Sequence, residues 1–245
     1  MRSDEFIRQI LQLAQDDEKF EELRSGTPLG LDVVGNVMLS QKYTGATAFR
    51  HTCVAGCKRT DFIRRLLLTL ACLYEKDEAC FLVLSPKTEY GELLRFRNMD
   101  ITVPYITTKN DLENAKVTLN ELIQMRKGAQ AFPKLFLILD GLETVPDCNK
   151  NGDLEEYRNI FELITRVANV ELITGVDIVK SIFSGYPGAF VGIGNCLVAT
   201  QEDGKADVTY VNADASLSQP VPMQFPCAPS ITETILFLNS LPSEA

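Results

Sequence analysis

The 245-residue sequence predicts an α/β fold with a doubly wound, mainly parallel sheet and an antiparallel C-terminal hairpin. The first observation is that short apolar runs alternate with longer segments of helical periodicity, as in successive β-α-β units. The second is that these runs are mostly apolar rather than alternating, which is typical of a sheet buried on both faces. The third is a turn sequence near residue 203 that joins two strand-like segments, which predicts the hairpin.

The central elements are expected in the order strand, helix, strand, helix, strand, helix, strand. Their ranges are 52–55, 61–74, 81–84, 111–127, 135–139, 154–167 and 170–174. We expect Asn110 and Glu113 to cap the second of these helices and Gly128 to end it.

The two ends of the chain add further elements. Apolar residues at helical spacing predict one amphipathic helix over 4–24, which a Ser-Gly-Thr-Pro sequence ends. A hairpin around Gly35-Asn36 is expected next, from strands at 30–34 and 37–40. The C-terminal hairpin pairs 195–200 with 206–211, and Ser230 and Glu233 cap a final helix over 231–239. We therefore divide the chain into an N-terminal helical segment, 1–28, and a single α/β domain, 29–245.

Composition narrows the function. No apolar run approaches the ~20 residues that cross a bilayer, and the N-terminus does not resemble a signal peptide, so we expect a cytoplasmic protein without membrane insertion. Seven cysteines without a C-x-x-C pair, and one histidine, support neither a disulfide framework nor a zinc site. The formal charge of 24 minus 33, or −9, does not favour DNA binding, although a local basic patch can override it.

The candidate site lies beyond the carboxyl ends of the parallel strands, where ligands bind in such sheets. The first strand runs into Gly56, Cys57, Lys58, Arg59 and Thr60. A phosphate-binding loop, G-x-x-x-x-G-K-[ST], wraps phosphates with backbone amides, reaches them with lysine and holds magnesium through a hydroxyl. This segment keeps the first glycine, is about three residues shorter and has Arg-Thr in place of Lys-Ser. It is a degenerate nucleotide-binding loop, and an ordinary strand-to-helix turn is the alternative.

The second feature is the apolar run that ends in Asp140-Gly141-Leu142-Glu143. An acid in this position usually coordinates magnesium, and the following residue activates the attacking water. Here the following residue is glycine. Glu143 is two residues further on and is expected to point elsewhere, so the general base is missing and no catalytic residue is assigned.

Single residues complete the candidate set. Lys87 follows the second strand and could project toward a phosphate or a neighbouring subunit, with a solvated lysine as the alternative. Thr174 ends the last parallel strand, where a polar residue often senses the terminal phosphate. His51 is expected to be structural, since no second histidine or paired acid is near it in sequence.

In order along the chain, these pieces resemble the FtsK/SpoIIIE family of DNA-translocating ATPases. The matching segments are Leu29–Asn36, His51–Gly56, Phe81–Lys87, Val103–Ile106 and Phe190–Leu197. The resemblance spans residues 4 to 215 and implies a P-loop NTPase (RecA-like) fold, with ATP and magnesium as cofactors. Gly56 and Asp140 match the family's pattern, Arg59 and Thr60 approximate its Lys-Ser, and Gly141 replaces its catalytic glutamate.

Three functions follow as hypotheses. The first is a degenerate member, a pseudo-ATPase that joins or regulates a ring of subunits through protein contacts. The second is an active translocase of DNA or polypeptide, which uses Arg59, Thr60 and Asp140 in altered geometry. The third is a nucleic-acid-binding module based on Lys58, Arg59, Arg64 and Arg65.

Overall fold

The computed structural model describes the greater part of the chain. The described residues are 1–40, 51–126, 133–146, 155–164, 167, 169–176, 196–201, 204–210, 218–227 and 229–241. Among the residues and segments named above, Gly128, the turn near residue 203 and 190–195 lie outside these ranges, as does one of the seven cysteines, Cys148.

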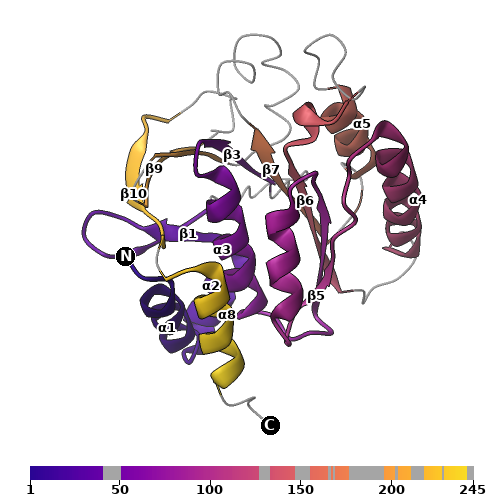
Figure 1. The fold of residues 1–245 in the computed structure, drawn as a ribbon. Coiled ribbons are helices and arrows are strands. Elements are labelled where there is room, and N and C mark those ends of the chain that lie inside the picture. Colours follow the sequence, from indigo (N-terminus) through magenta and orange to yellow (C-terminus); the bar gives the residue numbers. More distant parts are fainter. Residues whose placement is uncertain are drawn as a thin grey trace.

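A ten-stranded sheet forms the centre of the molecule, in the order β2-β1-β10-β9-β8-β3-β7-β6-β4-β5 (Figure 1). Six neighbouring strands are parallel: β8 (Cys196–Thr200), β3 (His51–Gly56), β7 (Val170–Val176), β6 (Lys134–Asp140), β4 (Ala79–Leu84) and β5 (Asp100–Thr102). Antiparallel pairing continues from β8 through β9 (Lys205–Tyr210), β10 (Val221–Gln224), β1 (Pro28–Leu31) and β2 (Val37–Leu39). The predicted fold class, including the C-terminal hairpin, is confirmed.

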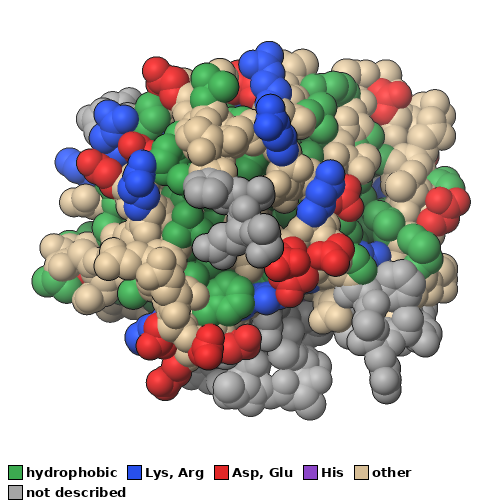
Figure 2. Space-filling view, turned by 90° about the horizontal axis from the view of Figure 1, so that it is seen from below, with side chains coloured by type: hydrophobic (Ala, Val, Ile, Leu, Met, Phe, Trp, Pro, Cys, Tyr) green, Lys and Arg blue, Asp and Glu red, His purple; other side chains and the backbone are tan. Residues whose placement is uncertain are grey.

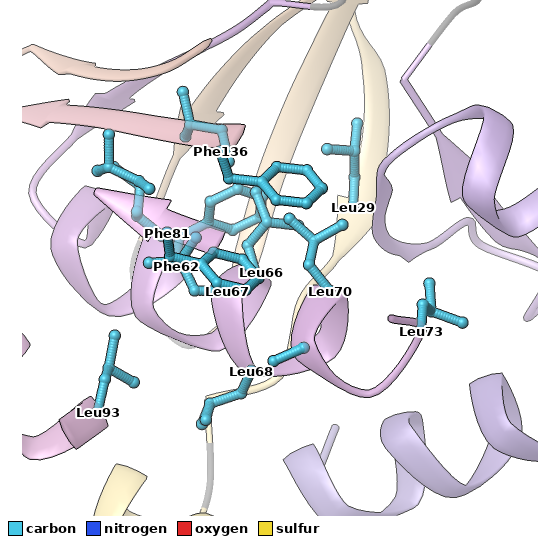
Figure 3. Packing of buried hydrophobic residues seen from close by; sticks show 14 of the residues in the cluster. Leu29, Phe62, Leu66, Leu67, Leu68, Leu70, Leu73, Phe81, Leu93 and Phe136 are labelled. Atoms are coloured by element: carbon cyan, nitrogen blue, oxygen red, sulfur yellow. The ribbon is translucent and has the colours of Figure 1, made fainter. Parts of the chain in front are cut away.

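Successive residues of a strand point to opposite faces of the sheet. Because both faces of the parallel strands carry apolar side chains, helices cover both. One face packs against α1 (Ser3–Leu13), α3 (Arg59–Ala71), η1 (Thr88–Arg95) and α8 (Ile231–Ser240). The other face packs against α4 (Lys109–Arg126) and α5 (Glu155–Ile164). Figure 3 shows the first core, where the stacked rings of Phe81 and Phe136, 5.0 Å apart, lie over leucines of α3.

The N-terminal segment differs from its prediction, because it forms two helices rather than one. The first, α1, ends at Leu13, and α2 covers Asp17–Ser25. The Asp16 carboxylate accepts a hydrogen bond of 3.0 Å from the backbone N–H of Lys19, which is a standard N-cap interaction. Phe6, Ile7 and Ile10 of α1 are buried in the core beneath α3. The separation of 1–28 as a segment of its own remains a prediction.

Other differences concern caps and short elements. Helix α4 is capped by Thr108 and Asp111, which exchange side-chain and backbone hydrogen bonds, and not by Asn110 and Glu113. The first hairpin turn is wider than predicted, because the Asp32 carboxylate accepts the N–H groups of Val34 and Asn36. Strands β5 and β10 and the 3₁₀ helices η1 and η2 (Leu142–Thr144) were not predicted. No described helix is long and apolar enough to span a membrane.

Candidate functional site

The candidate site lies where β3, β4, β6 and β7 end, at one edge of the parallel sheet. The connection between β3 and α3 is the first part of it. It consists of only two residues, the exposed Cys57 and Lys58, because β3 ends at Gly56 and α3 begins at Arg59. A chain this short has too few amides to wrap a phosphate group in the manner of the longer motif.

Gly56 is held in its conformation by its neighbour across the sheet. Its φ of +105° lies in a region that residues with side chains rarely adopt. A Cβ atom here would lie 2.2 Å from the carbonyl oxygen of Thr200 and 2.6 Å from its Oγ1. Glycine at position 56 is therefore required for packing against β8, whether or not a ligand binds.

The Asp140 carboxylate is fully buried and both of its oxygens are engaged. Oδ1 accepts a hydrogen bond of 2.7 Å from the Arg59 Nε. Oδ2 accepts from the Thr60 hydroxyl at 2.8 Å and from the Tyr90 hydroxyl at 2.9 Å. The guanidinium of Arg59, itself only 4% exposed, also donates from Nη2 to Glu143 at 3.0 Å.

Lys87 completes this group. Its ammonium donates to the Thr60 hydroxyl at 2.7 Å and lies 3.7 Å from the Asp140 Oδ2. With Asp140 and Glu143 as anions and Arg59 and Lys87 as cations, the formal charges of the group cancel. The arrangement is a closed ion-pair network, in which each charge has a partner within the chain.

Magnesium does not fit the residues as they stand. The ion takes oxygen ligands in near-octahedral geometry at about 2.0–2.1 Å. At Asp140 the corresponding directions are taken by the Arg59 Nε, the Thr60 hydroxyl and the Tyr90 hydroxyl. Within the described residues, no group of three or more His, Cys, Asp or Glu side chains is arranged to hold a metal ion.

Several site residues lie differently from the sequence-based expectations. Glu143 does not point elsewhere, because Arg59 draws it into the network. Lys87 faces Thr60, so it is neither a free solvated lysine nor directed outward. Thr174 lies within β7 and donates to the backbone carbonyl of Thr52, so it is not part of the Asp140 group. His51 is buried and accepts from the backbone of Leu172, in agreement with a structural role.

Sequence reasoning missed Tyr90, and it gave no role to Gly175 beside Thr174. Tyr90 is buried on η1, and burial, followed by the neighbouring Asp140 carboxylate, raises its pKa well above the usual value, which keeps its hydroxyl protonated as a donor. Gly175 follows Thr174, and a Cβ atom there would lie 2.4 Å from the Asp140 Oδ1. Glycine at position 175 therefore leaves the space that the Asp140 carboxylate occupies.

The predicted basic cluster is not a surface patch, so the proposed nucleic-acid surface is wrong. Arg59, Arg64 and Arg65 are buried, and only Lys58 of the four is exposed. Arg64 pairs with Asp61 and Glu92, while the other two also bond within the fold. On the face shown in Figure 2, Lys and Arg side chains are distributed among acidic ones rather than gathered into one area.

Comparison with known proteins shows which solved structures share this fold. No protein-family model matches the sequence, and no curated protein is similar to it. Solved structures do match. The cytoplasmic domain of the Thermomonospora curvata type VII secretion ATPase EccC aligns with a TM-score of 0.59 and 13% identity, over 88% of this chain and 31% of that one. EssC (ATPases 2 and 3) from Geobacillus thermodenitrificans aligns with a TM-score of 0.55 and 12% identity, over 89% of this chain and 50% of that one.

A third structure, described as an ATPase, aligns with a TM-score of 0.62 and 12% identity. The alignment covers 91% of this chain and 94% of that one. The chain has the fold of a P-loop ATPase domain. At these identities the likeness extends to the fold alone. This ATPase-fold chain spans a third to a half of the EccC and EssC chains that it matches.

Proposed function

We propose that this ATPase-fold chain does not hydrolyse ATP and acts through protein contacts, as a structural or regulatory subunit. One observation carries the proposal. Both oxygens of the Asp140 carboxylate, the group that would bind magnesium, are bonded to side chains of the same chain. Binding of magnesium would first require these buried hydrogen bonds to break, at a cost of about 1–3 kcal/mol for each group left unsatisfied.

Two further features support the loss of hydrolysis. The two-residue connection between β3 and α3 provides no phosphate cradle. Gly141, with a φ of +79°, occupies the position of the water-activating glutamate. Glu143 is the next acid along the chain, but its carboxylate already pairs with Arg59. The site thus lacks the loop, an accessible metal ligand and the base.

The expected partners are proteins. EccC and EssC are, by their descriptions, ATPases of type VII secretion or tandem ATPase domains, and this chain corresponds in length to one part of such a chain. We infer that it assembles with other ATPase-fold subunits, in a ring or as an accessory to one, at the cytoplasmic side of a secretion-like assembly. Contact with DNA is not favoured, because the net charge is −9 and three of the four clustered basic residues are buried.

A phosphate-release assay tests this function. The purified protein, incubated with Mg-ATP, is expected to release phosphate at the background rate, and the Asp140→Ala variant should give the same rate. Turnover above background that Asp140→Ala abolishes would show that the enzyme has survived. Adding a candidate ring-forming partner to both proteins extends the assay to the assembled state.

The competing function is an active translocase of polypeptide or DNA. It is favoured by the proximity of Arg59 and Thr60 to Asp140, which places the degenerate loop residues beside the acid as in a working site. This function requires Mg-ATP to change the assembly. Light scattering with and without Mg-ATP should show a nucleotide-dependent oligomer if it is correct, and the same mass in both conditions if it is not.

A further inference from the structure

We propose that Arg59 is a permanent, covalently attached substitute for the metal ion at this site, and that it positions Asp140 and Glu143 in the way that a bound cation would. The inference rests on the proposed function, because it assumes that the site no longer binds magnesium with nucleotide. It adds a specific role to one residue. Arg59 is then a positioning residue and takes no part in a reaction.

The guanidinium lies between two carboxylates that come from separate elements. Its Nε donates to Asp140 at the end of β6, and its Nη2 donates to Glu143 on η2. Arg59 itself begins α3, and the next residue, Thr60, also bonds to Asp140. One cation therefore joins the start of α3 to the end of β6 and to the 3₁₀ turn that follows it.

The site needs a cation at this position. Asp140 is fully buried and Glu143 is only 14% exposed, so two carboxylates would repel each other strongly without a positive charge between them. Lys87 cannot provide that charge alone, because its ammonium is 3.7 Å from Asp140 and bonds directly to Thr60. Removal of Arg59 leaves a buried, oxygen-lined position with an unbalanced negative charge.

Carboxylate and hydroxyl oxygens are also the ligands that hard divalent cations prefer. If Arg59 fills a cation position, a small divalent cation should be able to replace its side chain once it is removed. An arginine that only packs within the core would leave a gap that no ion restores. These two outcomes separate the proposal from an ordinary buried ion pair.

The experiment is a rescue of stability in the Arg59→Ala variant, measured by thermal unfolding in metal-free buffer and then with millimolar MnCl2 or MgCl2. Loss of a buried pair should lower Tm by roughly 10 °C. We expect the divalent ion to restore at least half of that loss in Arg59→Ala. It should change the wild-type Tm little, and it should fail in the Arg59→Ala/Asp140→Asn double variant.

Arg65→Ala is the matched control. Arg65 lies on the same helix and is similarly buried, but it donates to the Ser3 hydroxyl and to the backbone carbonyls of Cys227 and Pro229. Its loss of stability should not respond to manganese. Arg59→Lys should recover part of the stability without metal, since an ammonium keeps the charge but cannot donate to both acids in the same fork.

If Arg59→Ala is destabilised and neither ion restores it, the proposal is wrong. If that variant does not fold, Arg59→Gln is refolded with and without MnCl2, and failure to fold in both conditions also overturns the proposal. Because no nucleotide is present, these results are separate from the proposed function. ATP turnover by the wild type would contradict that function, whereas absence of rescue contradicts only the role of Arg59.

Discussion

The Asp140 carboxylate connects residues from two separate parts of the sequence: Arg59 and Thr60 at the start of α3, and Lys87 and Tyr90 at the start of η1. In a dry environment each of these donors contributes more than it would in water, and each becomes costly if left without a partner. Through these contacts Asp140 contributes to the stability of the fold.

A comparison of two acids tests this view. Asp140→Asn should lower the free energy of unfolding by about 3–5 kcal/mol, because it leaves the buried Arg59 with Glu143 as its remaining counter-charge. Glu143→Gln should cost less, about 1–2 kcal/mol, since that side chain is partly exposed and its amide oxygen can still accept from Arg59. Urea unfolding of both variants measures the difference. Equal losses would contradict the central place of Asp140.

Restoring an acid beside Asp140 should not restore a catalytic base. Gly141 has a left-handed φ of +79°, so Gly141→Glu should cost about 1–2 kcal/mol in backbone strain. Gly141→Ala should cost a similar amount, while Gly141→Asn should cost less, because asparagine tolerates this conformation better. Denaturant unfolding gives the order, and a phosphate-release assay of Gly141→Glu should stay at background. If Gly141→Glu is as stable as the wild type, the strain argument fails.

The sequence could predict where the candidate site lies, but not which side chains bond to one another within it. Gly56, Thr60 and Asp140 were identified because they end strands or begin a helix, and strand ends meet at one edge of a parallel sheet. The ion pair between Arg59 and Asp140 joins residues 81 positions apart, and nothing local in the sequence specifies it. Tyr90 had no motif around it. The visible signals of an altered site were the shortened loop, Arg59 in place of the usual lysine, and Gly141 after the acid.

Among the elements, the strands were the most predictable. β3, β4, β6 and β7 are buried on both faces, so their sequences are mostly apolar. Their bounds differ from the predicted ranges by two residues or fewer at each end. The break between α1 and α2 was missed because the apolar pattern continues across it, whereas α1 ends at Leu13 and the N-cap at Asp16 begins a new helix. β5 has three residues, two of them exposed, which is too little pattern to detect.

Helix α8 offers a test of a predicted cap. The Ser230 hydroxyl accepts from the backbone N–H of Glu233, and the Glu233 carboxylate accepts in return from the Ser230 N–H. Ser230→Ala should lower the free energy of unfolding by about 1 kcal/mol. Ser240→Ala, at the other end of the helix, is the control and should change it by less than about 0.5 kcal/mol. Equal effects in urea unfolding would show that the cap contributes little.

Over the whole molecule, the thiols report on packing. Burial raises the pKa of Cys53, Cys72 and Cys196 to about 12, whereas Cys57 and Cys227 are exposed. At pH 8 these buried thiols remain protonated and shielded, so among the cysteines within the described ranges an alkylating reagent should label Cys57 and Cys227 first. Peptide mass spectrometry of native and urea-treated protein checks this. Rapid native labelling of Cys53 or Cys196 would contradict the packing of β3 and β8.

The central claim for the whole molecule is that an ATPase fold has been kept while its nucleotide site has been closed by the chain's own side chains. Isothermal titration of the purified protein with ATP in the presence of magnesium tests it most directly. The network around Asp140 predicts no binding heat above dilution at up to millimolar ATP, in the wild type and in Asp140→Asn alike. Micromolar binding by the wild type that Asp140→Asn abolishes would contradict the claim.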